Sequence, residues 1–139
     1  MIAFIVCTTI IEMYPYPDKL EAFTVCEMIV KESESQGVDP GLAVALGHHE
    51  SGLRRFAVSK VGAVGPLQVL PKYYPKGCGI DVKGQIKAGV IMLKNALRRA
   101  KGDEVLAVAM YNSGNKPGKR AFRWSRSVIS LAQKLRGEK

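Results

Sequence analysis

The sequence predicts a single all-α domain, and three observations lead to this prediction. Apolar residues recur at helical spacing in several segments of the chain. Most of these segments begin at an aspartate that can cap free backbone N–H groups or are followed by a glycine that can end a helix; the aspartates are Asp18, Asp39, Asp81 and Asp103, and the glycines are Gly37, Gly52 and Gly114. With 139 residues, 47% apolar and 24% charged, the chain is long enough for one core of ordinary size.

Residues 1–17 form an apolar arm ahead of the domain, which we place at residues 18–139. The apolar run over residues 2–11 is too short to span a bilayer as a helix, so no stable membrane span is expected. It is similar to the centre of a signal peptide, but no Lys or Arg precedes it and no small-x-small cleavage site follows it. Its β-branched residues, Thr8 and Thr9 among them, also suit a short buried strand or a packed arm. An export signal or anchor stays open beside these alternatives. The following Tyr14-Pro15-Tyr16-Pro17 is a rigid, non-helical link.

The first two helices of the domain are marked at both ends. One is expected from Asp18 to Gln36, where Asp18 and Glu21 match a capping-box pattern. The next begins at Asp39-Pro40, because Asp39 suits the N-cap and proline suits the first helical position, and it ends at Gly52. After it, residues 54–64 are expected to form a loop. Residues 65–72 are expected to form a short helix or turn broken by Pro71 and Pro75. A minor β-hairpin in this part of the chain is the one β element expected.

The second half of the chain predicts three further helices. The longest helix of the chain should begin at Asp81, and a shorter one should follow Gly102-Asp103. Residues 115–123 are expected to be a polar, basic connection to the last helix. The residues expected on one face of each helix are Ile86, Val90, Leu93 and Leu97; Val105, Val108, Ala109 and Asn112; and Trp124, Val128, Leu131 and Leu135.

Charge and cysteine content restrict the function classes without choosing one. Twenty-one basic residues against twelve acidic ones give a net charge of +9, which favours a polyanionic partner: nucleic acid, anionic lipid or a bacterial wall. The three cysteines, Cys7, Cys26 and Cys78, are too few for a disulfide framework; one pair and a fully reduced chain are both compatible with the sequence. His48 and His49 are adjacent and cannot share one metal ion from one helix face. We therefore expect no metal site and no cofactor, with His49 packing or lining a groove.

Glu50 is the residue of greatest chemical interest. It lies four residues after Leu46 and eight after Leu42, which places it on the apolar face of its helix, close to the helix end. A carboxyl group partly buried among apolar side chains favours its neutral form, so its pKa should rise toward the range that a general acid needs. The alternative interpretation is a solvated helix-end residue or an ion pair with Arg54 or Arg55.

Three sequence blocks resemble those of the lytic transglycosylase and goose-type lysozyme family. The family pattern is Glu-Ser at a helix end, then Ser-x-x-Gly-Ala-x-Gly-Leu-Met-Gln, then Ala-x-Tyr-Asn-Ala-Gly. The corresponding blocks here are Glu50-Ser51, Ser59-Lys60-Val61-Gly62-Ala63-Val64-Gly65-Pro66-Leu67-Gln68, and Ala109-Met110-Tyr111-Asn112-Ser113-Gly114. They occur in the family's order, and the resemblance extends over roughly residues 18–134. Four residues depart from the family pattern: Pro66, Leu67, Ser113 and Leu53. These substitutions change the expected shape of the groove rather than its chemistry.

The resemblance implies a lysozyme-like fold and cleavage of the β-1,4 bond between N-acetylmuramic acid and N-acetylglucosamine in peptidoglycan. Glu50 would act first as acid and then as base, with 1,6-anhydromuramic acid as the product. Most glycosidases need two carboxylates, whereas this reaction consumes no water and needs one. Tyr111 matches the family tyrosine that orients or hydrogen-bonds the catalytic carboxyl. The remaining site residues implied are Ser51, Ser59, Gln68 and Asn112 as support and sugar-binding residues, and Gly62 and Gly65 as turns that let the glycan approach.

The resemblance also indicates where the protein acts and what it binds. The expected partner is the peptidoglycan glycan strand, with the chain a monomer acting at the bacterial wall, in the periplasm or outside the cell, or delivered by a phage virion or holin. Acidic stem peptides and teichoic polymers would attract a positive groove rim. The basic residues that could form this rim are Lys116, Lys119, Arg120, Arg123, Arg126, Lys134, Arg136 and Lys139.

Three other functions compete with this one. A goose-type lysozyme would share the glutamate and hydrolyse the bond with a positioned water. A non-catalytic wall-binding or virion-assembly protein would keep the fold without the chemistry. A small basic DNA-binding module is disfavoured, because the helices show no base-reading helix-turn-helix signature and the charge is spread rather than striped. No nucleic-acid partner is therefore expected.

Overall fold

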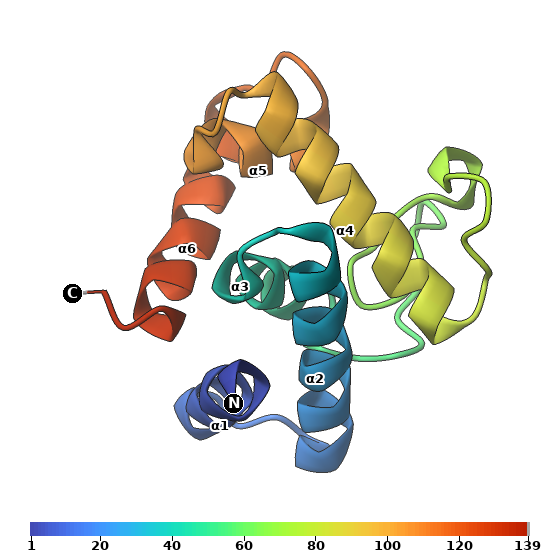
Figure 1. The fold of residues 1–139 in the computed structure, drawn as a ribbon. Helices are drawn as coiled ribbons and strands as arrows, with labels where there is room; N and C mark the ends of the chain where they lie inside the picture. Colours follow the sequence, from blue (N-terminus) through green and yellow to red (C-terminus); the bar gives the residue numbers. More distant parts are fainter. Residues whose placement is uncertain (139) are drawn as a thin grey trace.

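Helix α3 (Pro40–Ser51) lies at the centre of the molecule, with other helices around it (Figure 1). The structure is a computed structural model that describes residues 1–138, so Lys139, one of the basic residues expected at the groove rim, lies outside the described residues. Residues 41–47 of α3 are all buried, because this stretch contains only glycine and apolar residues on every face. The helix packs against α2 (Lys19–Gln36) on one flank and α6 (Lys119–Leu135) on the other.

The outer helices contact one another in sequence around this centre. Helix α2 packs on α4 (Val82–Arg99), α4 on α5 (Glu104–Ser113), and α5 on α6. The core between them contains fully buried Ile29, Leu42, Leu46, Leu53, Leu67, Ile86 and Leu93. Residues 1–138 contain six α-helices and no named strand, so the predicted all-α class is confirmed.

All four predicted aspartate caps are present. Each carboxylate accepts a hydrogen bond from the backbone N–H three residues later, at distances of 2.8 to 3.1 Å. Gly37 and Gly52 adopt the left-handed conformation that ends α2 and α3. Local capping chemistry therefore sets where these helices begin and end.

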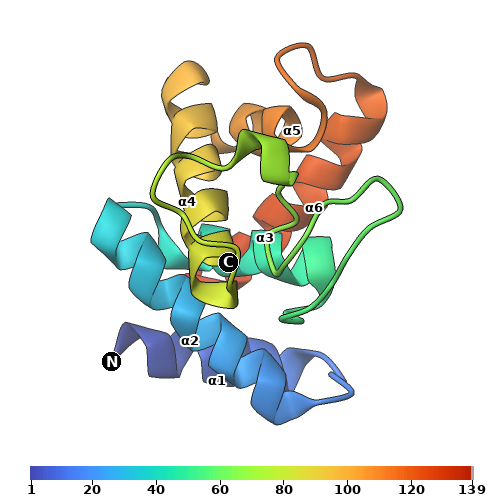
Figure 2. The same ribbon diagram turned by 90° about the vertical axis from the view of Figure 1, so that its right-hand side faces the viewer.

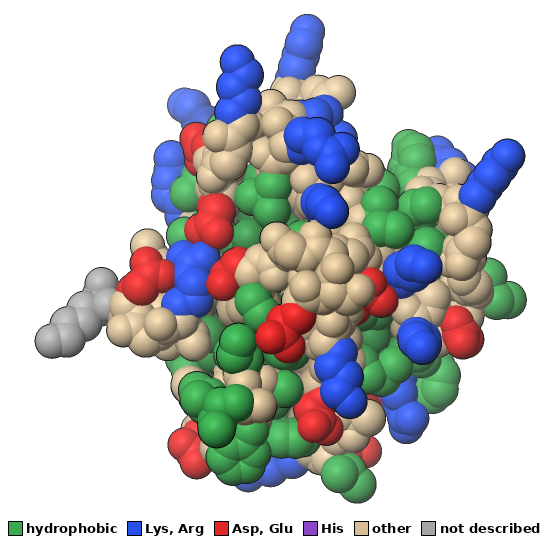
Figure 3. Space-filling model, in the orientation of Figure 1, with side chains coloured by type: hydrophobic (Ala, Val, Ile, Leu, Met, Phe, Trp, Pro, Cys, Tyr) green, Lys and Arg blue, Asp and Glu red, His purple; other side chains and the backbone are tan. Residues whose placement is uncertain are grey.

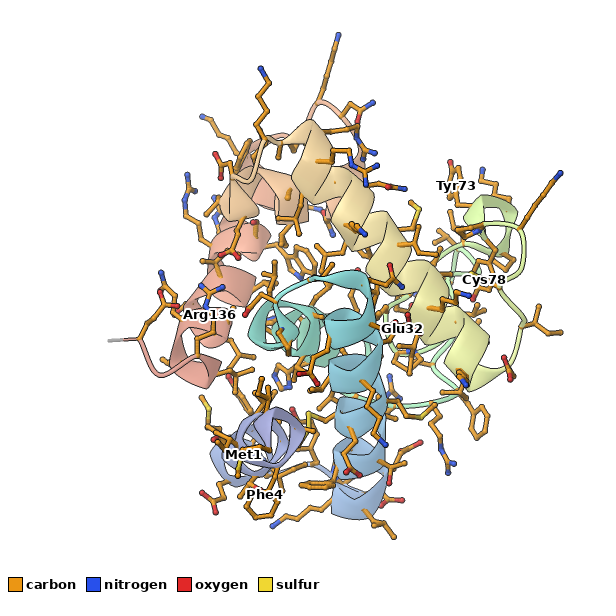
Figure 4. The ribbon with its side chains drawn as sticks, in the orientation of Figure 1. Met1, Phe4, Glu32, Tyr73, Cys78 and Arg136 are labelled. Carbon is orange, nitrogen blue, oxygen red and sulfur yellow. A yellow bond between two sulfur atoms is a disulfide. The ribbon has the colours of Figure 1, made fainter. Side chains whose placement is uncertain are left out.

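The N-terminal arm is helix α1 (Ile2–Met13) and not the short strand that its β-branched residues had suggested. It packs against α2, and a disulfide joins Cys7 to Cys26 while Cys78 is free. Met1 and Phe4 point away from the rest of the molecule (Figure 4), and apolar side chains gather on this corner in Figure 3. No helix within residues 1–138 combines the length and apolar character needed to cross a membrane.

The connection between α3 and α4 is irregular and lies beside both helices (Figure 2). Isolated antiparallel bridges pair Val58 with Val64 and Val64 with Val69. These bridges are the β structure found where a minor β-hairpin was expected. The predicted short element over residues 65–72 is a series of turns. Pro71 does not break a helix there; it begins the 3-10 helix η1 (Pro71–Tyr73), since proline suits a first helical position.

One predicted boundary and one predicted helix length are wrong. Helix α6 begins at Lys119, inside the segment expected to be a connection over residues 115–123. Its N-cap is Gly118, which has no side chain to accept a capping bond, so the sequence carries no start signal there. Helix α4, expected to be the longest, has 18 residues and is equalled by α2.

Candidate active site

Glu50 occupies the last turn of α3 and is partly buried. Burial raises the pKa of its carboxyl to about 7, because the charged form loses water that the protein does not replace. Among residues 1–138, no side chain or backbone group donates a hydrogen bond to this carboxyl, and no cation pairs with it. Glu50 can therefore carry a proton at neutral pH.

The alternative ion pairs of Glu50 are not formed. Arg55 instead pairs with Glu21, with 3.6 Å between Nε and the carboxylate oxygen. The Nε of Arg54 donates to the carbonyl oxygen of Ser51 at 2.7 Å, which holds this side chain against the end of α3. Both guanidinium groups are thus directed elsewhere.

Glu50 opens into a cavity of about 580 Å³ between α3, the 59–73 segment, α4 and the end of α5. Its polar lining comes from the predicted residues Ser59, Gln68, Tyr111 and Asn112, together with Arg99, Ser113 and Tyr73. Its apolar lining includes Val61, Ala63, Val69, Leu70, Met92 and Met110. Of the described residues that line this cavity, Glu50 is the single carboxylate.

Tyr111 lies beside Glu50 but does not hydrogen-bond to it. Its hydroxyl donates to the carbonyl oxygen of Leu67 at 2.6 Å, and a phenol has only one proton to donate. Burial, and then the nearby Glu50 carboxyl, hold the pKa of Tyr111 well above its usual range. Of the two roles that the resemblance implies for this tyrosine, a hydrogen bond to the carboxyl is not formed, and orientation of the carboxyl stays a prediction. Tyr111 joins α5 to the turn that carries Gln68.

Gln68 is held by its own side chain. Its backbone has a φ of +53°, a left-handed conformation that is uncommon outside glycine. The side-chain Nε2 donates to the carbonyl oxygens of Ala57 and Gly65, both at 3.0 Å. Both amide protons are then committed to the backbone, so the carbonyl oxygen of the side chain is the group that Gln68 can offer to a ligand.

Of the other predicted residues, two line the cavity and one stabilises the end of α3. Asn112 is exposed at the end of α5 and lines the cavity, as does Ser59, whose hydroxyl also accepts from the N–H of Ala63 at 3.1 Å. Ser51 is buried outside this lining. Its hydroxyl donates to the carbonyl of Gly47 and accepts from the N–H of Arg54, which completes the end of α3.

Gly62 and Gly65 serve the loop rather than line the cavity. Gly62 has a φ of +88° in a turn closed by a hydrogen bond from its N–H to the carbonyl of Ser59. Gly65 has a φ of +80°, and a Cβ there would lie 2.3 Å from the side-chain oxygen of Gln85. Pro66 is buried and does not line the cavity, so this departure from the family pattern leaves the groove free.

Sequence reasoning missed Arg99, Met92 and Tyr73. Arg99 follows Lys94 and Arg98 on a helix whose basic residues look like one solvated face, so no sequence signal separates it from them. Met92 and Tyr73 reach the cavity only through the packing of α4 against the turns, and Figure 4 shows Tyr73 on η1. These positions depend on tertiary structure.

His48 and His49 point away from this cavity into an aromatic cluster. The Tyr16 hydroxyl hydrogen-bonds Nδ1 of His48 at 2.5 Å, and the Tyr14 and His48 rings lie 4.1 Å apart between centroids. Burial, and then His49, lower the pKa of His48 to about 4. No group of three or more potential metal ligands occurs within residues 1–138.

Comparison with known families agrees with this arrangement. The model of the transglycosylase SLT domain matches residues 27–130, which is most of the chain. The chain belongs to the transglycosylase SLT domain family. The family is one of transglycosylase domains.

A solved structure shows the same fold as this SLT domain. It is an inactive Glu→Gln variant of the lytic transglycosylase Slt from Pseudomonas aeruginosa, with a TM-score of 0.69 and 21% sequence identity. The match covers 81% of this chain and 24% of that protein, so this chain spans about a quarter of its length. The match supports the lysozyme-like arrangement predicted from the sequence blocks.

Proposed function

We propose that this SLT domain is a peptidoglycan lytic transglycosylase with Glu50 as its acid and base. The observation that carries the proposal is the Glu50 carboxyl itself, raised in pKa to about 7 in a cavity with no second carboxylate among its described lining residues. A neutral carboxyl can protonate a leaving group, and the same group as a carboxylate can accept a proton afterwards. A hydrolase of the usual kind would need a further carboxylate to activate water.

The proposed reaction conserves every proton. Protonated Glu50 donates to the glycosidic oxygen, and the bond between that oxygen and C1 of N-acetylmuramic acid breaks. The N-acetylglucosamine unit leaves with a free hydroxyl. The Glu50 carboxylate then takes the proton of the muramic 6-hydroxyl, whose oxygen bonds to C1 and gives the 1,6-anhydro sugar. Glu50 ends protonated, as it began, and the substrate's N-acetyl group is proposed to stabilise the intermediate at C1.

The polar residues around Glu50 support this proposal by what they can offer. The side-chain oxygen of Gln68 suits an N–H donor such as that of an N-acetyl group, because both of its amide protons are already used. Asn112 and Ser59 line the same cavity and can bond sugar hydroxyls. Tyr111 acts as a positioning residue, since it fixes the backbone that carries Gln68.

The structural relative offers independent support for a glutamate of this kind. Replacement of one glutamate by glutamine gives an inactive form of the Pseudomonas protein. We propose the same outcome for Glu50→Gln here. The substitution removes the acid and keeps a side chain of nearly the same shape.

We also propose that the protein works at the bacterial wall, outside the reducing cytosol. The Cys7–Cys26 disulfide supports this site of action, because disulfides persist in oxidising compartments. The net charge of +9 agrees with an acidic wall as partner.

Mass spectrometry of the muropeptides released from purified sacculi tests the reaction. The wild-type chain should release anhydro products lighter by one water molecule than hydrolytic ones, and Glu50→Gln should release none. Hydrolytic products that disappear in Glu50→Gln would make the chain a muramidase instead. Products that persist in Glu50→Gln would remove Glu50 from the mechanism.

A further inference from the structure

A second cavity, of about 1020 Å³, runs along the outer face of α6 and shares no described lining residue with the Glu50 cavity. We call it the α6 groove. Most of its lining residues belong to α6, and the others are Tyr14, His49, Pro117 and Gly118. Of the basic residues expected at the rim of the glycan groove, none that the structure describes lines the Glu50 cavity. Four of them line the α6 groove instead: Lys119, Arg123, Arg126 and Lys134.

The polar side chains of the α6 groove form one stripe along the helix. They follow one another at intervals of three or four residues, in the order Lys119, Arg123, Arg126, Ser130 and Lys134. Residues at this spacing share one face of a helix. At about 1.5 Å per residue, the stripe is about 22 Å long. The groove therefore presents a row of separate positive charges rather than a single compact cluster.

The protein does not neutralise the charges of the α6 groove. Among residues 1–138, the cations found in ion pairs are Arg55 and Arg136. Arg136, at the C-terminal end of α6 (Figure 4), bonds Asp39, Glu104 and Glu138 and lines neither cavity. The expectation that Arg136 lines a groove rim is therefore wrong, whereas the four groove cations are exposed and keep their charge available for a ligand.

The α6 groove does not present an apolar surface to a membrane. None of its lining residues is among the exposed large apolar side chains, and several of those, such as Ile2, Phe4 and Ile5, lie on α1 instead. Phe122 is half-buried and Leu131 is buried. Peripheral membrane sites combine basic residues with apolar side chains that enter the lipid. The groove thus fits a soluble polyanion better than a lipid surface.

The aromatic rings of the α6 groove are already engaged within the protein. The Tyr14 and His48 rings lie 4.1 Å apart between centroids, and the guanidinium carbon of Arg126 lies 5.9 Å from the centroid of the Phe122 ring. Proteins that bind single-stranded nucleic acid stack its bases on free aromatic faces. The groove therefore suits a polyanion that carries no bases.

We propose that the α6 groove binds a linear polyol-phosphate chain of the teichoic type, as an anchoring site separate from the reaction at Glu50. Each unit of such a chain carries one phosphodiester anion and a polyol with free hydroxyl groups. The anions match the row of Lys and Arg side chains. Ser127 and Ser130 line the same groove and can bond the polyol hydroxyls. The choice of a wall polymer rests on the proposed place of action, whereas the binding does not require the Glu50 carboxyl.

Binding of a labelled polymer to the full chain tests the proposal. The probe is poly(glycerol phosphate) freed of its lipid, and its fluorescence anisotropy is followed as protein is added at several salt concentrations. The test variant carries Arg123→Gln and Arg126→Gln. The matched control carries Lys94→Gln and Arg98→Gln, a pair of exposed cations about one turn apart on α4 that line neither cavity. Thermal unfolding confirms that each variant is folded.

The test variant should lose affinity selectively. Its dissociation constant should rise about five- to twentyfold at low salt, while that of the control rises less than about twofold. The slope of the logarithm of the dissociation constant against the logarithm of salt concentration should fall by about 1.4, since each of the two lost phosphate contacts contributes about 0.7.

A second variant tests the polyol part of the ligand. Ser130→Ala should raise the dissociation constant for poly(glycerol phosphate) about two- to fivefold, because a hydrogen bond to a hydroxyl group is lost. The same variant should bind inorganic polyphosphate, which has no polyol, as the parent does. An equal loss for both polymers would show that Ser130 does not recognise a polyol.

Several outcomes would overturn the proposal. Equal losses in the test and control variants would show a general charge effect, and equally tight binding of polyglutamate would show that phosphodiesters are not preferred. Tighter binding of single-stranded DNA or of phosphatidylglycerol vesicles, lost in the test variant, would assign the groove to nucleic acid or to a membrane.

Glu50→Gln separates this inference from the proposed function. The variant should bind poly(glycerol phosphate) as the parent does, because the two cavities share no described lining residue. A loss of polymer binding in Glu50→Gln would contradict a separate anchoring site. A parent chain that binds the polymer but cleaves no glycan would refute the proposed function and leave the anchoring site in place.

Discussion

At the scale of single residues, the raised pKa of Glu50 follows from burial together with the lack of a cation or hydrogen-bond donor at its carboxyl among the described residues. Its helix position, four residues after buried Leu46, brings it to the edge of the core, and Arg54 and Arg55 bond elsewhere. Desolvation then acts without a compensating cation, so its pKa rises to about 7. The same burial predicts that both the rate of cleavage and the stability of the fold fall as the pH rises.

The rate of glycan cleavage should fall as the pH rises above about 7. The acid step needs protonated Glu50, and the protonated fraction drops about tenfold for each pH unit above its pKa of about 7. The measurement is kcat for muropeptide release between pH 5 and pH 9. A rate that stays constant up to pH 9 would contradict the assignment of Glu50 as the acid.

Glu50→Gln should stabilise the protein at alkaline pH. The folded-state pKa of Glu50, about 7, exceeds its ordinary value of 4.5, so between these values the folded chain holds a proton that the unfolded chain releases. Stability is therefore lost as the pH rises from about 4.5 through 7, by an amount of order 3 kcal/mol. Glutamine stays neutral and avoids this loss.

Urea unfolding at pH 4 and pH 8 measures the effect. Glu50→Gln should match the parent at pH 4 and exceed it at pH 8. Glu34→Gln, a substitution of an exposed carboxylate on α2, is the control and should change stability little at either pH. An equal effect of Glu50→Gln at both pH values would show that the Glu50 carboxyl is not desolvated.

Tyr111→Phe should weaken the protein through Leu67 rather than through Glu50. The substitution leaves the Leu67 carbonyl without its 2.6 Å donor, at a cost of about 1 to 3 kcal/mol. Because the Gln68 turn is loosened while the acid remains, KM should rise more than kcat falls. A large fall in kcat at unchanged KM and stability would instead show that the Tyr111 hydroxyl acts on the reacting groups.

The sequence blocks predicted which residues line the cavity better than they predicted the hydrogen bonds of those residues. Glu50, Ser59, Gln68, Tyr111 and Asn112 all line one cavity, as expected from motifs that meet in the fold. The partner of the Tyr111 hydroxyl and the two backbone acceptors of Gln68 depend on a turn whose shape no local rule predicts. Motif spacing therefore indicates which residues gather, and tertiary packing determines what each one bonds.

At the scale of elements, close packing of α4 against the 65–68 turns shapes the cavity. A Cβ on Gly89 of α4 would lie 2.4 Å from Cβ of Leu67, so only glycine lets the helix approach this closely. Leu67 is almost fully buried, and its carbonyl receives the Tyr111 bond. The wall of the cavity thus depends on a small residue in the helix opposite.

Gly89→Ala should destabilise the protein even though alanine is the better helix former. Alanine would gain about 0.5 to 1 kcal/mol of helix propensity, but displacement of Leu67 should cost about 1 to 3 kcal/mol. The melting temperature should fall, because Leu67 is displaced. The KM for glycan strands should rise, because Gln68 follows Leu67 and moves with it. A more stable variant with unchanged KM would show that this approach is looser than the structure indicates.

The Cys7–Cys26 disulfide should stabilise the protein without contributing to the reaction. It closes a loop with a sequence separation of 19, for which the chain-entropy contribution is about 3 kcal/mol. Cys7→Ser with Cys26→Ser should lower the melting temperature and keep the product unchanged. Cys78→Ser is the control, because Cys78 is free. A melting temperature that does not change in the double variant, or on addition of reductant, would contradict this role.

The starts of helices with a side-chain cap could be predicted from sequence, whereas the start of α6 and the helical state of α1 could not. Asp18, Asp39, Asp81 and Asp103 each mark a helix start that the structure contains. Helix α6 begins at uncapped Gly118, and α1 contains β-branched residues that are helical because they pack on α2. Tertiary packing overrides propensity at both places.

At the scale of the whole molecule, the fold separates two chemical environments on either side of the end of α3. One cavity holds the carboxyl of Glu50, and a second cavity, along α6, is lined by four cations, Lys119, Arg123, Arg126 and Lys134. Lys and Arg side chains also project from the end of the molecule where α4 and α5 meet (Figure 3). Among the described residues, neither group of cations forms an ion pair with the Glu50 carboxyl.

The pKa of Glu50 itself decides whether this residue can be the acid. The side-chain carboxyl carbon is followed by ¹³C NMR between pH 3 and pH 9, and its signal is assigned by its loss in Glu50→Gln. We predict a midpoint at about 7, matching the pH at which kcat begins to fall. A midpoint near the ordinary value of 4.5 would show a solvated carboxylate at neutral pH and would contradict the role of Glu50 as the acid.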